Sequence, residues 1–354
     1  MPIRLGANGP NGLPLKPPRV RGTLEGLSAS VSFAYLFGWF TPAPIFMDFR
    51  LLPAFQTSHS RRLWLHGIGA AAAVAALQTL GTQAHAQTAR RDKAQQRMPV
   101  IFIGHGSPMN AISDSAFTRR LARWGQELPR PSAILSISAH WLTRGSTAID
   151  VQTRPKTIYD FSGFPPALTD ISYPAPGDPA RARQAAALVK QAKVVATQDW
   201  GLDHGTWTVL HHLYPKADIP VFQLSIDYDQ PAAFHRAVGR DLAALRDSGV
   251  LILGSGNVAH NLRATDRGRP DGVMASRPWA QAFDNAVKQA LAERDDAALT
   301  AYAKLPGADV AVATPDHYYP FMYALGAADA QERPKTIYEG FQAGTISMRC
   351  VQFG

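Results

Sequence analysis

The chain has 354 residues, of which 46% are hydrophobic and 18% are charged, a composition ordinary for a globular protein of one large or two small domains. The formal net charge is +9, but residues 1–97 hold 11 Lys and Arg against 3 Asp and Glu, which leaves 25 basic and 24 acidic residues in 98–354. The larger part of the chain therefore lacks the basic excess typical of proteins with a nucleic-acid partner. The single cysteine, Cys350, excludes an intramolecular disulfide and a thiolate metal cluster.

The first element along the chain has the layout of an export signal. Arg61 and Arg62 precede a weakly apolar stretch rich in Ala and Gly at 66–80, and residues 84–86 (AHA) provide a cleavage site of the A-x-A kind. Paired arginines before a diluted apolar segment are typical of a twin-arginine signal. The stretch is shorter than the roughly 20 apolar residues of a membrane span, and an amphipathic helix with an incidental arginine pair is the alternative interpretation.

These features divide the chain into four segments. Residues 1–46, rich in Pro and Gly, are expected to be an upstream extension that contributes little to the fold, and Met47 is a natural start for the signal. We expect 47–86 to be the twin-arginine-type signal, 87–97 a polar linker and 98–354 the folded domain. The leader is then expected to engage the twin-arginine export machinery, and the mature protein is expected in the periplasm.

Residues 98–354 alternate between short apolar runs and helical patterns. The predicted strands are 100–103, 133–138, 193–196, 221–225 and 250–254. The predicted helices are 115–127, 179–191, 230–247 and 277–294. Continuous apolar strands separated by helices indicate a mostly parallel central sheet covered by helices on both faces. We therefore predict a single α/β domain, closed by a hairpin over 336–340 and 345–353.

Three histidines follow predicted strands. His105 lies just after the first strand, His140 just after the second, and His260 shortly after the strand at 250–254. In open α/β sheets, ligands bind outside the carboxyl ends of the strands, and imidazole is the commonest metal ligand in proteins. The sequence therefore predicts that these three side chains converge on one site at that edge of the sheet.

Two more histidines, His204 and His317, lie in short loop-like segments, each directly after an aspartate. Asp203 or Asp316 could orient an imidazole without binding metal itself. Adjacent residues rarely both point at one ion, so Asp316 and His317 compete for a ligand position. An imidazole-rich set without cysteine suits Zn, Fe, Cu or Ni, and the sequence does not choose among them.

The remaining histidines are expected to be structural or exposed. His211 and His212 lie in a helical stretch, and His235 is expected on an exposed helix face. Ser107 and Ser255 both lie between glycine-rich neighbours but lack the G-x-S-x-G spacing of a hydrolase nucleophile. The histidines of the leader are His59, His66 and His85.

Six motifs occur in an order that resembles a known family. They are 104–109 (GHGSPM), 138–141 (SAHW), 173–177 (YPAPG), 201–207 (GLDHGTW), 256–262 (GNVAHNL) and 314–318 (TPDHY). Together they resemble the class III, or LigB-type, extradiol ring-cleaving dioxygenases, in the bacterial branch similar to 4,5-DOPA dioxygenase. The resemblance covers about 98–354, which would make this segment the catalytic domain.

The resemblance implies an enzyme that opens a catechol ring with O2 at a mononuclear non-haem Fe(II) site, which Zn(II) can fill in place of iron. By position, His105 and His140 would be metal ligands and His317 the third. His260 matches a histidine that is either a further ligand or the acid–base group, and His204 would assist proton transfer in the same pocket. The wider class uses two histidines and one carboxylate, so His317 departs from its pattern.

Two alternatives remain at the level of sequence. The first is a zinc-dependent hydrolase on the same fold, since a site of histidines alone is normal for zinc. The second is a non-catalytic periplasmic metal-binding protein. Oxygen uptake with a catechol would separate the dioxygenase from both, and no pattern in the sequence specifies an oligomeric state. The residues expected as apolar walls for an aromatic ring are Trp141, Phe161, Phe164, Trp207 and Tyr318.

Overall fold

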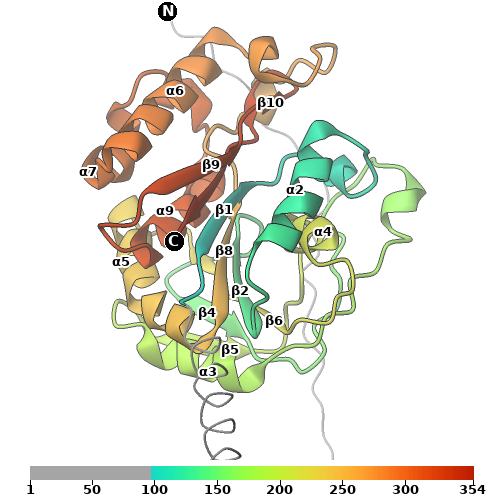
Figure 1. Cartoon of the computed structure of the whole chain (residues 1–354), viewed down its shortest axis with the longest axis vertical. Helices are drawn as coiled ribbons and strands as arrows, with labels where there is room; N and C mark the ends of the chain where they lie inside the picture. Colours follow the sequence, from blue (N-terminus) through green and yellow to red (C-terminus); the bar gives the residue numbers. More distant parts are fainter. Residues whose placement is uncertain (1–96) are drawn as a thin grey trace, which may run out of the picture. The chain divides into compact units, whose positions relative to one another are not determined.

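Four of the five apolar runs predicted as strands, together with two strands of the predicted closing hairpin, form a six-stranded sheet at the centre of the structure (Figure 1). The computed structural model describes residues 97–354. In spatial order the strands are β6 (Val221–Gln223), β2 (Ala133–Ser138), β8 (Val250–Gly256), β1 (Val100–Gly104), β12 (Cys350–Phe353) and β9 (Pro334–Tyr338). The first four run parallel to one another. At one edge β12 pairs antiparallel with β1, and β9 pairs antiparallel with β12. This confirms the predicted α/β domain with a mostly parallel central sheet.

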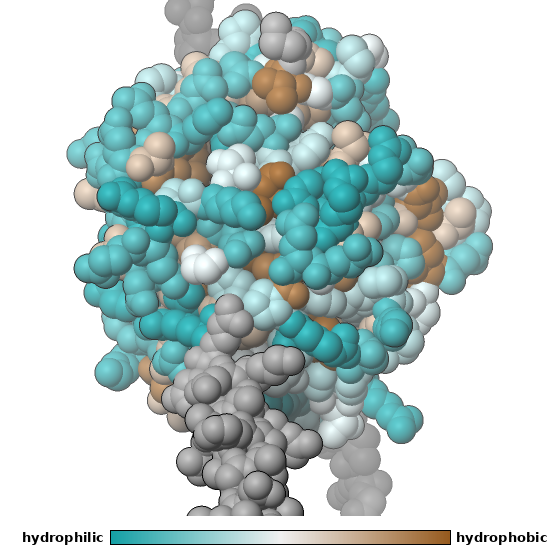
Figure 2. Space-filling view, in the orientation of Figure 1, coloured by the Kyte–Doolittle hydropathy of each residue, from teal (hydrophilic) through white to brown (hydrophobic). Residues whose placement is uncertain are grey.

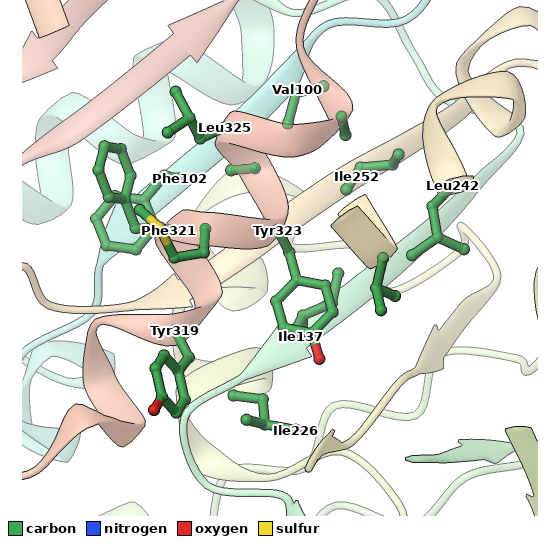
Figure 3. Close-up of a cluster of buried hydrophobic side chains, with 14 of the residues drawn as sticks. Val100, Phe102, Ile137, Ile226, Leu242, Ile252, Tyr319, Phe321, Tyr323 and Leu325 are labelled. Atoms are coloured by element: carbon green, nitrogen blue, oxygen red, sulfur yellow. The ribbon is translucent and has the colours of Figure 1, made fainter. Parts of the chain in front are cut away.

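Helices cover both faces of the sheet. They are α2 (Ala116–Glu127), α3 (Pro179–Leu188), α4 (His204–Leu213), α5 (Ala232–Leu242), α6 (Pro278–Glu293), α7 (Asp296–Thr300), α8 (Ala308–Ala311) and α9 (Tyr319–Ala327). Along β1, Val100 and Phe102 face one core, whereas Ile101 and Ile103 face the other. Helices α3, α5, α6 and α9 line the first core, part of which is shown in Figure 3, and α2 and α4 line the second. Burial on both faces explains why these strands are continuously apolar.

One predicted strand lies outside the central sheet. The run at 193–196 is β5 (Val194–Thr197), which pairs in parallel with β4 (Thr147–Asp150) in a separate two-stranded sheet. Its side chains are half-buried or exposed, so its apolar composition did not show which sheet this strand joins. The other short strands are β3 (Leu142–Thr143), β7 (Ile226–Asp227), β10 (Phe341–Gln342) and β11 (Ile346–Ser347).

The predicted helices are present, with changes at their ends. The helix predicted over 230–247 is α5 followed by a 3-10 segment, Ala243–Ser248, which ends at Gly249 in the left-handed conformation (φ 80°). Helix α2 begins with a capping box in which the Ser115 hydroxyl accepts from the Thr118 amide. The further 3-10 segments are Pro108–Ala111, Pro166–Leu168, Leu262–Ala264, Val273–Ala275, Tyr302–Lys304 and Pro315–His317.

The expectation for His235 was wrong. This residue lies on α5 but is fully buried against α9, where its ring lies 4.0 Å from that of Tyr319. Its two nitrogens are both satisfied, by the Tyr323 hydroxyl at 3.0 Å and the Gln230 carbonyl at 3.2 Å. The hydrophobic pattern of α5 did not reveal this, because histidine counts as a polar residue in such a pattern. A neutral imidazole whose two nitrogens are both hydrogen-bonded can nevertheless be buried in a core at little cost.

The predicted closing hairpin is also present, as the antiparallel pair β9 and β12. The face of the molecule in Figure 2 is mainly hydrophilic, with apolar side chains in small separate groups. None of the helices described in residues 97–354 combines the length and apolar character that crossing a bilayer requires. The predicted leader, 1–46 and 47–86, and nearly all of the linker lie outside the described residues.

Candidate metal centre

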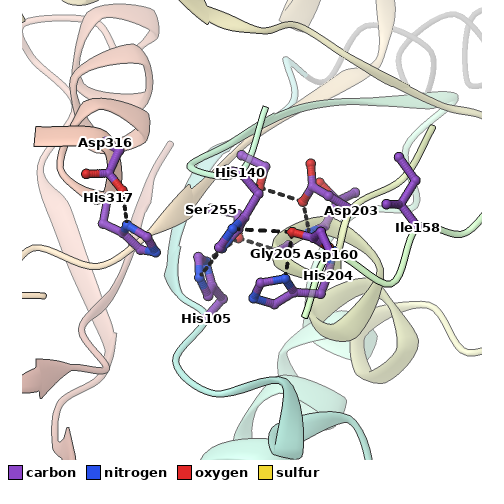
Figure 4. Close-up of polar contacts among 12 residues, drawn as sticks. His105, His140, Ile158, Asp160, Asp203, His204, Gly205, Ser255, Asp316 and His317 are labelled. Carbon is purple, nitrogen blue, oxygen red and sulfur yellow. Dashed lines mark hydrogen bonds and ion pairs between the residues drawn. The ribbon is translucent and has the colours of Figure 1, made fainter. Parts of the chain in front are cut away.

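Five histidines meet at the carboxyl edge of the parallel strands. His105 follows β1, His140 follows β2, and His260 follows β8. His204 is the first residue of α4, not part of a loop as expected, and His317 ends the 3-10 segment before α9. Figure 4 shows four of these side chains, those of His105, His140, His204 and His317, near one another. The ring of His105 lies 5.0 Å from that of His140 and 5.3 Å from that of His317, between centroids.

Three of these imidazoles have the spacing of a metal site. The Nε2 atoms of His105 and His140 are 3.1 Å apart. One ring nitrogen from each of His105, His140 and His317 lies within 4.8 Å of the others. Two imidazoles on one tetrahedral ion, with bonds of about 2.0–2.1 Å, would hold their nitrogens about 3.4 Å apart. The donor set therefore fits a metal with nitrogen ligands.

The hydrogen bonds of His105 fix which of its nitrogens faces the site. The Ser255 hydroxyl donates to the Gly205 carbonyl, so its oxygen is left to accept from His105 Nδ1 at 3.0 Å. With the proton on Nδ1, the Nε2 atom carries a free lone pair. Ser255 thus orients His105 in the site. From the sequence, Ser255 had been considered only as a possible hydrolase nucleophile.

His317 is oriented by its neighbour in the sequence. The Asp316 carboxylate accepts from His317 Nδ1 at 2.7 Å, so the imidazole, and not the carboxylate, is directed at the other histidines. Burial would raise the pKa of Asp316, but the hydrogen bond from His317 outweighs it and lowers the pKa to about 2. Of these two adjacent residues, His317 is therefore the candidate metal ligand, and Asp316 is the residue that orients it.

A third carboxylate, Asp160, was missed in the sequence. Its Oδ2 atom lies 2.9 Å from His204 Nδ1 and 3.4 Å from His140 Nδ1. Burial would raise the pKa of Asp160, but the hydrogen bond from His204 outweighs it and keeps the pKa below its usual value. Asp160 lies in an irregular segment without a recognisable motif, so only the folded chain brings it to the histidines.

Asp203, by contrast, orients no imidazole. It caps the first turn of α4 by accepting from the Thr206 amide, and it accepts from the Ser138 hydroxyl at 2.6 Å and from the Gln223 amide at 2.8 Å. Burial raises the pKa of this carboxyl. Its contribution is to fix the start of α4 against β2, and thereby the position of His204.

His260 lies parallel to His317, with ring centroids 3.5 Å apart and planes 6° apart. The lone pair of an imidazole lies in the plane of its ring, so two stacked parallel rings do not direct lone pairs at one point. Burial, and then the nearby His317, lowers the pKa of His260 to about 2. Burial also lowers the pKa of both His105 and His140 well below 6.5, so these imidazoles are neutral near pH 7, as metal ligation requires.

Of the expected aromatic walls, Phe161 packs against a histidine of the centre. Its ring is 5.7 Å from that of His204 and 5.5 Å from that of the exposed Phe164. Trp141 is buried and stacks on Trp200 at 5.5 Å. The other two candidates are core residues: Trp207 donates to the Ile158 carbonyl and Tyr318 to the Leu299 carbonyl.

Comparison with known proteins decides the family. Residues 99–353 match the family described as the catalytic LigB subunit of aromatic ring-opening dioxygenase. This chain belongs to the LigB family. It is 46% identical over 262 residues to the 4,5-DOPA dioxygenase extradiol of Escherichia coli K12, covering 73% of this chain and 95% of that protein.

Other LigB relatives agree. The 4,5-DOPA dioxygenase extradiol of Beta vulgaris is 38% identical over 260 residues, covering 72% of this chain and 95% of its own. A crystal structure of an uncharacterized protein from Escherichia coli K12 superposes with a TM-score of 0.64 and 42% identity, covering 73% of this chain and all of that one. The chain is therefore an enzyme of the extradiol dioxygenase class, and LigB dioxygenases use a metal.

Proposed function

We propose that this enzyme cleaves the ring of a catechol with O2 in an extradiol manner, and that the catechol resembles DOPA. The observation that carries the proposal is the convergence of His105, His140 and His317 at the strand ends of a LigB domain, with two Nε2 atoms 3.1 Å apart. The relatives named as 4,5-DOPA dioxygenases support the choice of substrate.

We propose that the metal is Fe(II), held by His105, His140 and His317, with Zn(II) able to occupy the same ligands. Neutral imidazoles suit either ion. When bound, the metal supplies a common attachment point for catechol and O2 and stabilises the negative charge that develops there. His260 is not assigned as a metal ligand, because its ring is stacked in parallel on that of His317.

The two remaining histidines differ in what they do with a proton. His204 donates from Nδ1 to Asp160 at 2.9 Å, so its Nε2 can take a proton from a catechol hydroxyl while the carboxylate stabilises the imidazolium. Burial lowers the pKa of His260 to about 2, so its ring is neutral near pH 7 and can accept a hydrogen bond from the substrate but carries no extra proton. We therefore assign His204 as the base and, once it is protonated, as the group that returns the proton to the opened ring.

A pocket beside the centre fits the charged tail of such a substrate. It has a volume of about 400 Å³ and is open to solvent, and its lining includes Arg144, Tyr228, Thr314 and Asp316. The Arg144 guanidinium lies 4.8 Å from the centre of the Tyr228 ring. Arg144 is ion-paired with Asp229, and Asp316 with His317, so the carboxylate of an amino acid would share or displace the exposed pair of Arg144.

We also propose that the enzyme acts in the periplasm, after export through a twin-arginine signal at 47–86. The paired arginines and the A-x-A site at 84–86 support this, and the family match at 99–353 is compatible with a catalytic domain over 98–354. N-terminal sequencing of protein recovered from the periplasm tests the assignment. We expect a start at Gln87, and a mature chain that begins near Met1 would refute it.

The experiment that tests the activity is anaerobic loading of the full chain with Fe(II), followed by L-DOPA and oxygen. We expect oxygen uptake together with a yellow ring-opened product. Protein loaded with Zn(II) in parallel is the control and should take up none. Absence of uptake with several catechols, combined with hydrolysis of an ester or amide by the zinc form, would replace the dioxygenase by the hydrolase.

A further inference from the structure

One carboxylate at the edge of the metal centre serves two imidazoles with different roles. Asp160 Oδ2 faces both His204 Nδ1, at 2.9 Å, and His140 Nδ1, at 3.4 Å (Figure 4). Its other oxygen accepts from the backbone amide of His204 at 2.9 Å. The carboxylate thus contacts a proposed metal ligand, a proposed base and the first turn of α4 at once.

The backbone holds Asp160 in this place. Nearby in the same segment, the Ile158 amide donates to the Leu202 carbonyl at 2.8 Å, and the Leu202 amide donates to the Lys156 carbonyl at 2.8 Å. The Trp207 indole, on α4, donates to the Ile158 carbonyl at 3.0 Å. The segment that carries Asp160 is therefore fastened to the start of α4, and the position of the carboxylate relative to His204 is fixed by both.

An ionised carboxylate only accepts hydrogen bonds. His204, which is hydrogen-bonded to the carboxylate, must then carry its proton on Nδ1, which leaves a bare Nε2. His140 Nδ1 lies 3.4 Å from the same oxygen, and the negative charge there favours a proton on this nitrogen as well. The Nε2 of His140 faces His105 at 3.1 Å, and the ring of His204 lies 3.9 Å from that of His140 between centroids. One negative group thereby fixes the tautomer of His204 and favours the matching tautomer of His140.

We propose that Asp160 is a positioning residue that couples metal binding to proton transfer, by fixing His140 as an Nε2 ligand and His204 as an Nε2 base. The inference rests on the proposed function of the site. Asp316 differs from it, because among the described imidazoles it is hydrogen-bonded to that of His317 alone.

Replacement by asparagine shows why the carboxylate is needed. If the amide oxygen introduced by Asp160→Asn faced the imidazoles, the new NH2 group would face the backbone N–H of His204, so two donors would oppose each other. In the opposite orientation the NH2 group would face the Nδ1 atoms, and the imidazoles could accept from it only with their protons moved to Nε2. Asp160→Asn therefore either loosens the start of α4 or turns the Nε2 atoms from acceptors into donors.

The first test measures Zn(II) affinity and histidine tautomers, which do not depend on catalysis. Zn(II) competition with a chromophoric chelator should give a dissociation constant about 10–100-fold higher for Asp160→Asn than for wild type. ¹⁵N NMR of the Zn(II)-loaded protein should show His204 protonated at Nδ1 in wild type and altered in the variant. Asp160→Glu, which keeps the charge, should retain the Nδ1 tautomer and serves as the second variant if Asp160→Asn does not fold.

The second test is a double-mutant cycle on turnover. At saturating Fe(II), Asp160→Asn and His204→Gln should each lower kcat by about 100-fold or more, and the double variant should be no slower than the slower single variant. Zn(II) affinity should still fall when Asp160→Asn is added to His204→Gln, because that effect acts through His140.

Fully additive losses in kcat, or an unchanged Zn(II) affinity and tautomer in Asp160→Asn, would overturn the proposal. An inactive wild-type enzyme would refute the proposed function instead, while the Zn(II) and NMR measurements would continue to test the role of Asp160. The two failures are therefore distinguishable.

Discussion

His235 makes the folded protein sensitive to acid, and one substitution can isolate its effect. The residue is fully buried on α5, with Tyr323 and Gln230 as hydrogen-bond partners. Burial lowers the pKa of His235 from 6.5 to about 4. A charged imidazolium at this place would keep its two polar contacts but lose its hydration, and the hydroxyl of Tyr323 would have to turn from donor to acceptor.

The size and sign of the effect follow from this pKa difference. Between about pH 6.5 and pH 4 the unfolded chain holds a proton on this residue and the folded chain does not, so the free energy of unfolding falls as the pH falls. A difference of about 2.5 pKa units corresponds to about 3 kcal/mol once the transition is complete. About 2 kcal/mol of this should be lost between pH 7.5 and pH 5.

Urea unfolding of metal-free protein at these two pH values measures the effect. Wild type should lose about 2 kcal/mol more than His235→Gln on acidification, whatever the stability of the variant at pH 7.5. Gln can keep both hydrogen bonds without titrating. Val238→Ala, at a buried position on the same helix, is the matched control and should lower stability equally at both pH values. The same pH dependence in wild type and His235→Gln would refute the reasoning.

Three further predictions concern the metal centre. Ser255→Ala should raise the Zn(II) dissociation constant about 10–100-fold, because His105 Nδ1 loses its acceptor at 3.0 Å; equal affinity in a chelator competition would contradict that role. His105→Ala should abolish metal binding and activity together, so intact metal content by elemental analysis would show that the ligand assignment is wrong. Phe161→Ala should raise KM for the catechol about 3–10-fold with unchanged metal content, since its ring lies beside His204. Phe164→Ala, at an exposed position, should raise KM less. An unchanged KM in both variants would show that these rings do not contact the substrate.

The local features of the fold could be predicted because they depend on neighbours in the sequence. The apolar runs at β1, β2 and β8 are buried on both faces, so their composition indicated parallel strands. The same reasoning was insufficient for β5, whose four residues pair outside the central sheet. Strand pairing is decided by contacts distant along the chain, which a run of four residues does not encode.

The sequence by itself determined the fold class and the convergence of His105, His140 and His260, because strand ends of a parallel sheet share one edge and imidazoles placed after them must meet there. His204 and His317 were candidates because of their motifs. Only the tertiary structure decided what holds these imidazoles. Ser255, 150 positions from His105, and Asp160, 44 positions from His204, set the tautomers of their rings. Hydrogen bonds of this kind join loops that approach each other only once the sheet has formed, so no spacing in the chain records them. Even for neighbours the structure decided: Asp316 accepts from His317, whereas Asp203 caps α4 and orients no imidazole.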